Sequence, residues 1–228
     1  MSEQNNQINA QVNTPIYCSI DPVVFSIVDD QLHILLYKRP KDPHKDSWAL
    51  PGGLIRPDED MSLEDSVGRV LKLKTGAEVN YSEQLCSLGG YRDVRGWTLS
   101  VAYMALVSKQ EVNSVSEWIP VSELPNMHLA FDHDKIIDQG IKRLSDKVNY
   151  STLPIHLLGE NFTLPQLQKV YEILLGEELD KSTFRKKIEE TGLLQETGEM
   201  LREGAFRPAK LYKLKDQRVI NFGRNILK

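Results

Sequence analysis

Two apolar runs separated by three polar residues place the strongest constraint on how this 228-residue chain folds. The runs are residues 23–28 and 32–38, and they are joined by Asp29, Asp30 and Gln31. A short turn-forming connection between two such runs predicts a β-hairpin. Because an isolated hairpin is only marginally stable in water, the first part of the chain needs further strands and a covering layer.

Further strands and two helices are expected before residue 150. Residues 85–91 and 97–107 have strand character, and apolar residues alternate along the second run. One helix is expected to begin after Ser62, a good N-cap residue, and to end before Gly76, since glycine commonly closes a helix. Another is expected at about 132–144. Strands mixed with helices in this order predict an α+β fold in which helices cover a sheet, preceded by a flexible tail at 1–14.

The residues after 150 predict a small helical unit that ends in a β-hairpin. A first helix is expected at 162–176, where Thr163 and Gln166 form a capping-box pattern, and a second one between Asp180 and Thr191. Residues 193–198 and 209–214 then predict two strands, the wing of a winged helix-turn-helix domain. The expected domains are therefore 15–149 and 150–228.

The formal net charge of −4 conceals a difference between the two parts of the chain. Residues 1–150 carry 15 basic against 21 acidic residues, whereas residues 151–228 carry 13 against 11. From residue 205 onward, seven basic residues accompany Asp216 as the single acidic one. This distribution fits a phosphate-facing surface in the second part, and it fits a solvated basic tail equally well.

The sequence does not resemble that of a membrane or disulfide-bonded protein. Its apolar runs are far shorter than the roughly 20 residues that span a bilayer, and residues 1–14 lack the apolar stretch of a signal peptide. A cytoplasmic protein without a membrane partner is therefore expected. Cys18 and Cys86 lack the close spacing of metal ligands, so both are expected to be buried free thiols.

Residues 48–59 resemble the beginning of a Nudix box, with a Gly-Gly turn, five residues and a glutamate. In that family a following helix carries glutamates that hold magnesium against a diphosphate, and the fold is an α/β/α sandwich. Here the helix is reached with a two-residue insertion, and the three glutamate positions hold Val70, Leu73 and Lys74. Apolar side chains and an ammonium group cannot hold a hard cation, so neither a metal site nor a catalytic residue is expected.

Other carboxylates near the turn leave an enzymatic alternative open. Glu59, Asp60, Glu64 and Asp65 could form an unconventional magnesium site, and the chain would then be an ADP-ribose pyrophosphatase. Glu64 and Asp65 also fall in the first turn of the expected helix, where the helix dipole favours carboxylates, and this structural explanation is preferred. Magnesium-dependent release of AMP would distinguish the two.

A pocket that cannot cleave a dinucleotide-like diphosphate can still bind one. Guanidinium groups can hold the phosphate oxygens, and aromatic faces can hold a base. The expected ligand-binding residues lie around the Gly-Gly turn: Arg39, Trp48, Arg56, Tyr91, Arg92 and Arg95. His133 has the chemistry of an acid or base, but without a nucleophile or metal to serve, it is expected to form a hydrogen bond at a helix start.

The second helix of the C-terminal unit has the pattern of a recognition helix. Phe184 and Ile188 are one turn apart and are expected to face inward, so short polar and long cationic side chains face outward. The expected DNA-binding residues are Ser182, Thr183, Arg185, Lys186 and Lys187, with Arg207 and Lys210 in the wing. Since two packed helices are also the commonest small all-α unit, a protein-docking module is the alternative.

Both parts together resemble the NrtR family, the Nudix-related transcriptional regulators of NAD metabolism, over about residues 15–215. The C-terminal marks include Phe-Thr-Leu-Pro-Gln-Leu-Gln at 162–168, Phe-Arg-Lys-Lys at 184–187 and Arg-Pro-Ala-Lys-Leu-Tyr at 207–212. The resemblance implies a homodimeric repressor that binds a pseudo-palindromic operator near genes of NAD biosynthesis or salvage. It also implies that ADP-ribose in the Nudix pocket is the effector that releases the protein from DNA, with no cofactor required.

Overall fold

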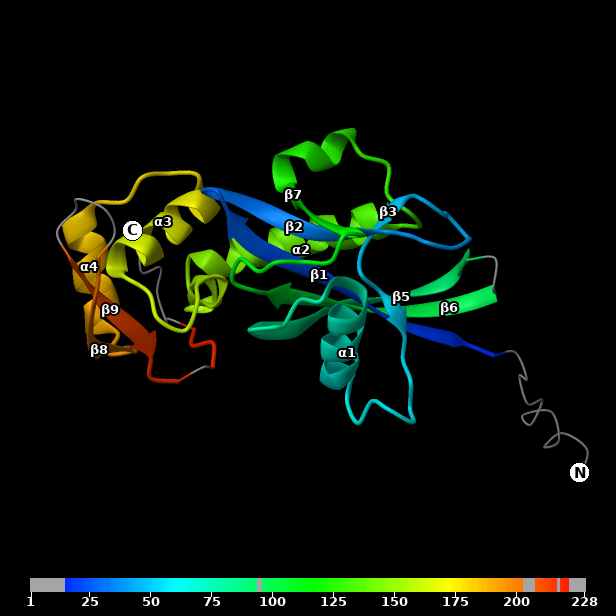
Figure 1. Ribbon diagram of the computed structural model, residues 1–228, viewed down its shortest axis with the longest axis horizontal. Coiled ribbons are helices and arrows are strands. Elements are labelled where there is room, and N and C mark those ends of the chain that lie inside the picture. Colours follow the sequence, from blue (N-terminus) through cyan, green and yellow to red (C-terminus); the bar gives the residue numbers. More distant parts are fainter. Residues whose placement is uncertain (1–14, 94–95, 203–207, 217, 222–228) are drawn as a thin grey trace, which may run out of the picture.

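A sheet domain and a smaller helical unit lie next to each other along the long axis of the molecule (Figure 1). The computed structural model describes residues 15–93, 96–202, 208–216 and 218–221. Within these ranges no helix is both long enough and apolar enough to cross a membrane. The expected tail at 1–14 lies outside the described residues.

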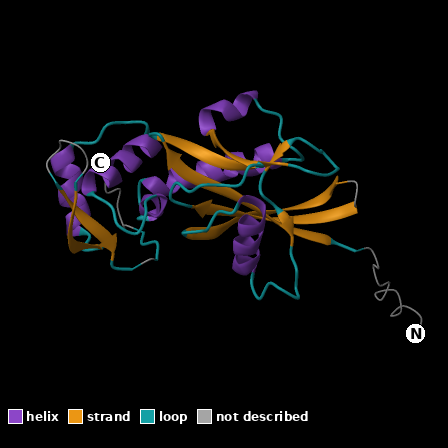
Figure 2. Ribbon diagram, viewed as in Figure 1, coloured by secondary structure: helices purple, strands orange, loops and turns teal. Residues whose placement is uncertain are grey.

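Seven strands of the described chain form one mixed sheet, drawn in orange in Figure 2. They are β1 (Tyr17–Val28), β2 (Gln31–Lys38), β3 (Trp48–Ala49), β4 (Gly53–Leu54), β5 (Tyr81–Asp93), β6 (Gly96–Leu106) and β7 (Ser116–Pro120). The strand order is β3-β2-β1-β6-β5, with β4 paired to β1 and β7 paired to β2. The β1–β6 pair is parallel, and the other strand pairs are antiparallel.

The predicted hairpin is confirmed, with a turn one residue shorter than expected. Val28 pairs with Gln31, so the loop consists of Asp29 and Asp30 alone, and their φ angles are 47° and 61°. Two positive φ angles are what a twisted two-residue hairpin turn requires, and aspartate tolerates them better than most residues do. β1 begins six residues before the expected start, because its polar first half pairs with β6 and β4.

Two helices cover opposite faces of the sheet, which confirms the predicted α/β/α sandwich. α1 (Leu63–Thr75) packs on a cluster that includes Ile20 and Val24 of β1. α2 (His133–Val148) packs on a cluster that includes Val23 and Phe25. Successive residues of a strand point to opposite faces, so β1 supplies both cores. The short helix η1 (Val121–Asn126) follows β7.

The predicted ends of α1 are confirmed. The Ser62 side chain accepts a hydrogen bond from the Asp65 N–H, and Gly76 closes the helix with a φ of 79°. α2 ends at Val148, four residues after the end predicted at 144. Val148 is fully buried in the core of the C-terminal unit, so packing between the two units extends the helix beyond what its own sequence pattern indicates.

The C-terminal unit is a winged helix, as predicted. It comprises η2 (Leu153–Leu157), α3 (Leu164–Leu175), α4 (Lys181–Glu190), β8 (Leu194–Leu201) and β9 (Ala209–Leu214). The capping box of Thr163 and Gln166 is present at the start of α3. Tyr171 and Phe184 pack edge to face at the centre of this core, with ring centroids 5.5 Å apart.

The two cysteines are free, as expected, but they are half-buried rather than buried. Partial burial still raises the pKa of both thiols, because a thiolate loses hydration there. Neither therefore has the lowered pKa of a reactive thiol.

A buried junction joins the two units. Leu153 and Leu157 of η2 belong to the core under α2, whereas Ile155 belongs to the core of the winged helix. The Tyr171 hydroxyl, on a fully buried side chain of α3, donates a hydrogen bond of 3.0 Å to the carbonyl of Ser151. Lys169 of α3 also forms an ion pair with Asp30 in the β1–β2 turn at 3.7 Å. The units therefore share a continuous apolar contact.

His156 is a polar group inside this junction. Its side chain is 4 % exposed and stacks on Tyr81, with ring centroids 4.9 Å apart. Its Nε2 atom has no hydrogen-bond partner within the part of the chain that the structure describes. Burial lowers the pKa of His156, because the imidazolium form would lose its hydration.

We expect the protein to lose stability as the pH falls below about 6.5, the usual pKa of histidine in an unfolded chain. There the unfolded chain binds a proton that folded His156 excludes, so acid favours unfolding. Urea unfolding between pH 7.5 and 5 should show a smaller loss of stability in His156→Phe than in the parent. His128→Phe, at an exposed histidine, is the control. An identical pH dependence in the parent and His156→Phe would contradict this expectation.

Candidate functional site

A cavity of about 530 Å³ opens beside the Gly52–Gly53 turn of the sheet domain. Its walls come from β1, β2 and β6, the loop at 40–43, the last turn of α1 and the start of α2. This volume lies within the roughly 300–1,000 Å³ typical of small-molecule sites. The cavity is therefore the candidate ligand site of the domain.

One wall of the cavity carries a buried carboxylate. Asp21 is 7 % exposed, and its Oδ2 accepts hydrogen bonds from the hydroxyls of Ser19, at 2.8 Å, and Ser100, at 2.5 Å. The parallel β1–β6 register places Ser19 opposite Ser100. The Gly-Gly turn passes directly over this group, since a Cβ added to Gly52 would lie 1.8 Å from Asp21 Oδ1. Only glycine fits at this position without displacing Asp21.

His133 lines the same cavity as the first residue of α2. Its Nδ1 accepts a hydrogen bond of 2.9 Å from the backbone N–H of Leu50, which agrees with the hydrogen-bonding role expected at this helix start. Burial lowers the pKa of His133, so the ring is neutral. A neutral ring that accepts at Nδ1 carries its proton on Nε2. His133 is therefore a hydrogen-bond donor through Nε2.

Two cations line the cavity, and each lies within hydrogen-bond distance of the Tyr37 hydroxyl. The Arg39 Nε donates to the Pro43 carbonyl at 2.8 Å, and its guanidinium lies 4.8 Å from the centroid of the Phe131 ring. The Lys74 Nζ lies 4.7 Å from the centroid of the Tyr37 ring. Fixed guanidinium and ammonium groups are suited to the oxygens of a phosphate or diphosphate.

The three residues predicted to stand at the glutamate positions of the Nudix helix have separate environments. Val70 is 2 % exposed and belongs to the core under α1, whereas Leu73 is 63 % exposed. Lys74 alone of the three lines the cavity. The last turn of α1 thus offers the cavity a positive charge.

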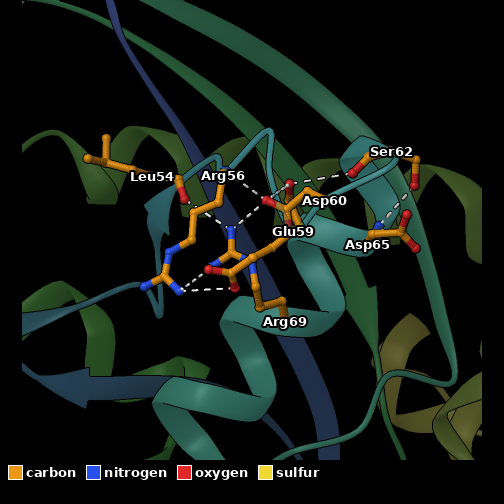
Figure 3. Close-up of polar contacts among 8 residues, drawn as sticks. Leu54, Arg56, Glu59, Asp60, Ser62, Asp65 and Arg69 are labelled. Atoms are coloured by element: carbon orange, nitrogen blue, oxygen red, sulfur yellow. Dashed lines mark hydrogen bonds and ion pairs between the residues drawn. The ribbon is translucent and has the colours of Figure 1, made fainter.

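An ion pair fixes the segment between the Gly-Gly turn and α1 (Figure 3). The Arg69 Nε and Nη2 atoms donate to the two carboxylate oxygens of Asp60 at 2.5 and 2.6 Å, and Nη2 also donates to the Leu54 carbonyl at 3.0 Å. The Arg69 guanidinium holds the pKa of the Asp60 carboxyl well below its usual range. The sequence gives only a weak signal for this ion pair. Arg69 is a single arginine that lies between Ser66 and Val70, two residues that face inward.

Three of the four carboxylates of the magnesium alternative are already engaged by other side chains. Both carboxylate oxygens of Glu59 accept from Arg56 at the surface, at 3.0 and 3.1 Å (Figure 3). Glu64 accepts from the Tyr103 hydroxyl at 2.9 Å, and Asp60 is paired with Arg69. Among the described residues, no group of three or more His, Cys, Asp or Glu side chains could hold a metal ion.

The cavity includes few of the ligand-binding residues expected from the sequence. Arg39 lines it, whereas Trp48 packs against the core, Arg56 pairs with Glu59 at the surface, and Tyr91 is 80 % exposed on β5. The Arg92 side chain and all of Arg95 lie outside the described residues. Asp21 and Lys74 were not expected to bind ligand. Asp21 was detectable as an acidic residue inside an apolar strand.

The outer face of α4 matches the pattern expected of a recognition helix. Phe184 and Ile188 face inward, each 2 % exposed, while Ser182, Thr183 and Lys186 are exposed. Asp180 caps the helix, and its Oδ1 accepts from the Thr183 N–H and the Ser182 hydroxyl, both at 2.8 Å. Hydrogen bonds from Thr183 first, and from Ser182, lower the pKa of Asp180 to about 2. Arg185 and Lys187 are half-buried.

The wing contributes Lys210 to the same unit. Lys210 Nζ pairs with both carboxylate oxygens of Glu196 on the neighbouring strand, at 2.8 and 3.0 Å, and this pairing raises its pKa. A phosphate would have to compete with Glu196 for this ammonium group. Arg207 lies outside the described residues.

Comparisons with known proteins identify both units. Residues 21–140 match the NUDIX domain, and residues 154–214 match the NrtR DNA-binding winged helix domain. The ADPR responsive transcriptional repressor NtrR of Acinetobacter baylyi is 40% identical over 202 residues, which cover 86% of this chain and 80% of the relative.

Two solved structures extend the likeness to three dimensions. Shewanella oneidensis NrtR complexed with a 27mer DNA is 42% identical, with a TM-score of 0.83 over 91% of this chain and 98% of that one. The NUDIX domain of the same protein complexed with ADP ribose is 38% identical, with a TM-score of 0.56 over 60% of this chain and 94% of that one. Sequence, fold and domain order agree throughout, and the chain belongs to the NrtR family, as a homologue of an ADP-ribose-responsive transcriptional repressor.

Proposed function

We propose that this chain is a transcriptional repressor. Residues 150–228 hold it on DNA, and ADP-ribose that is bound by residues 15–149 releases it from DNA. The observation that carries the proposal is the composition of the cavity. It is lined by the cations Arg39 and Lys74, and the described residues around it contain no carboxylate cluster for magnesium. The ADP-ribose response of the Acinetobacter repressor and the ADP ribose complex of the Shewanella domain support this choice of ligand.

The degenerate Nudix helix gives the cavity the chemistry of a sensor and not of a hydrolase. Lys74 and Arg39 can neutralise a diphosphate directly. An ammonium group, however, does not lower the pKa of a bound water as a metal ion does, so no attacking hydroxide is generated. With Val70 in the core and Leu73 at the surface, the helix offers no replacement ligand. ADP-ribose would therefore bind and remain intact.

The winged helix would read DNA through α4 and the wing. The proposed contacts are Ser182, Thr183, Arg185, Lys186 and Lys187 on α4, with Arg207 and Lys210 in the wing. The Shewanella relative has been solved in complex with a 27mer DNA, which supports DNA as the partner. One recognition helix contacts only a few base pairs, so we propose a homodimer on a pseudo-palindromic operator near genes of NAD biosynthesis or salvage, in the cytoplasm.

ADP-ribose is expected to release the protein from its operator in a gel-shift titration, and the nucleotide should be recovered intact after incubation with Mg²⁺. Lys74→Ala should raise the half-effective ADP-ribose concentration by about tenfold, the size of one charge-assisted hydrogen bond, without changing DNA affinity in its absence. Lys72→Ala is the matched control, because Lys72 lies on the same helix but pairs with Glu78 outside the cavity. Unchanged operator affinity at saturating ADP-ribose would refute the proposal.

Lys186→Ala is expected to weaken operator binding and to reduce the slope of log affinity against log salt by about one, because one phosphate contact is lost. Fluorescence anisotropy at several salt concentrations measures this slope. Lys142→Ala removes a comparably exposed lysine from α2 and should leave it unchanged. Equal slopes for the parent and Lys186→Ala would instead favour a protein-docking role for the winged helix.

Gly52→Ala is expected to weaken ADP-ribose binding, since the new methyl group would collide with Asp21 and displace the turn or the carboxylate. Gly68→Ala is the matched control, because a Cβ there has no neighbour within 4 Å and lies within α1. The Gly68→Ala substitution should raise the free energy of unfolding by up to about 1 kcal/mol, because alanine has a higher helix propensity than glycine. Calorimetric titration and thermal unfolding of both variants decide the point, and unimpaired binding by Gly52→Ala would show that ADP-ribose binding does not depend on the position of this turn.

A further inference from the structure

The cavity combines two sides of different chemistry. Arg39 and Lys74 line it as cations, whereas Ser19, Asp21 and Ser100 line it as an acidic and hydroxyl-bearing wall. A diphosphate is attracted to the first side and repelled by the carboxylate of the second. A ligand that fills the cavity must therefore carry, next to its phosphates, a group that interacts favourably with a carboxylate.

Asp21 is suited to accept hydrogen bonds from such a group. Its carboxylate is 7 % exposed, and no described lysine or arginine forms an ion pair with it. The partners of its Oδ2 are two serine hydroxyls, which donate their protons and keep lone pairs of their own. A buried carboxylate without a cation is costly, and that cost is reduced when a ligand supplies further hydroxyl donors.

His133 complements Asp21 as a donor. Because Nδ1 accepts the Leu50 N–H, the neutral ring has only Nε2–H to offer. Both side chains line the same cavity. An acceptor and a donor in one cavity match the hydroxyls of a sugar, each of which can donate one hydrogen bond and accept another. The carboxylate disfavours a phosphate at this position.

We propose that Asp21 and His133 select the ligand by binding the hydroxyls of a sugar esterified to the diphosphate. This rests on the proposed function, and it assigns the second ribose of ADP-ribose to the Asp21 side of the cavity. A ribose without a base is the smaller end of that molecule and suits Asp21 and His133, which are each only 7 % exposed. ADP lacks this second ribose and supplies no sugar hydroxyl to Asp21 and to the Nε2–H of His133, so the cavity favours ADP-ribose over ADP.

The test measures the affinities of the full chain for ADP-ribose and for ADP by calorimetric titration. The parent should prefer ADP-ribose. Asp21→Asn should weaken ADP-ribose binding by roughly tenfold or more and leave ADP binding unchanged or slightly improved, so that the preference collapses. Asp42→Asn is the matched control, because Asp42 is an exposed carboxylate at the same cavity and its loss should affect both ligands equally.

A second variant keeps the proposal testable if Asp21→Asn fails to fold. In His133→Asn the amide oxygen can replace Nδ1 as the acceptor for Leu50, while the Nε2 donor is lost, and the preference for ADP-ribose should fall again. If ADP-ribose does not release the parent from its operator, the proposed function itself is wrong. If it does, but the parent binds ADP equally well or either folded variant keeps the parent's preference, this inference alone is overturned.

Discussion

The pairing of β1 is the constraint on which the sheet domain depends. This strand pairs with β2 and β4 in antiparallel orientation and with β6 in parallel orientation, so its register determines which residues of these strands are neighbours. Its alternate residues supply the cores under α1 and under α2. On the α2 side of the sheet, Phe25 and Val23 of β1 belong to the core. The next residues of β1 on that side, Asp21 and Ser19, line the cavity. The same alternation that builds the core thus brings polar groups into the cavity where the core ends.

The ion pair of Asp60 with Arg69 shows how the turn can be ordered without a metal ion. Arg69 ties the end of β4 to α1, because it binds the Leu54 carbonyl together with the Asp60 carboxylate. Ser66 and the backbone of Arg56 supply two further donors to Asp60. With these contacts the position of α1 relative to the turn is set by the protein's own charges. Lys74, one turn farther along the helix, can then lie at the cavity as a cation.

Local patterns predicted the elements well, because they depend on neighbouring residues. The hairpin around Asp29 and Asp30, the Ser62 and Gly76 caps and the capping box at Thr163 were all predicted, and all are present, with the hairpin turn one residue shorter than expected. The cavity was predicted poorly. Clustering arginines and aromatics by their distance along the chain suggested Trp48 and Arg56, yet one packs on the core and the other on Glu59. Asp21 and Ser100 are brought together only by the parallel register, which no local pattern encodes.

The helix α2 connects the two functional regions. Its first residue, His133, lines the cavity, and its last, Val148, is buried in the core of the winged helix. Beyond it, Ser151 donates to the Lys147 carbonyl and accepts from Tyr171 of α3. A ligand can shift DNA binding only if it binds the two states of the protein with different affinity. Because its ends lie at the cavity and in the core of the winged helix, α2 is, together with η2, one of the packed elements that join the sheet domain to the winged helix.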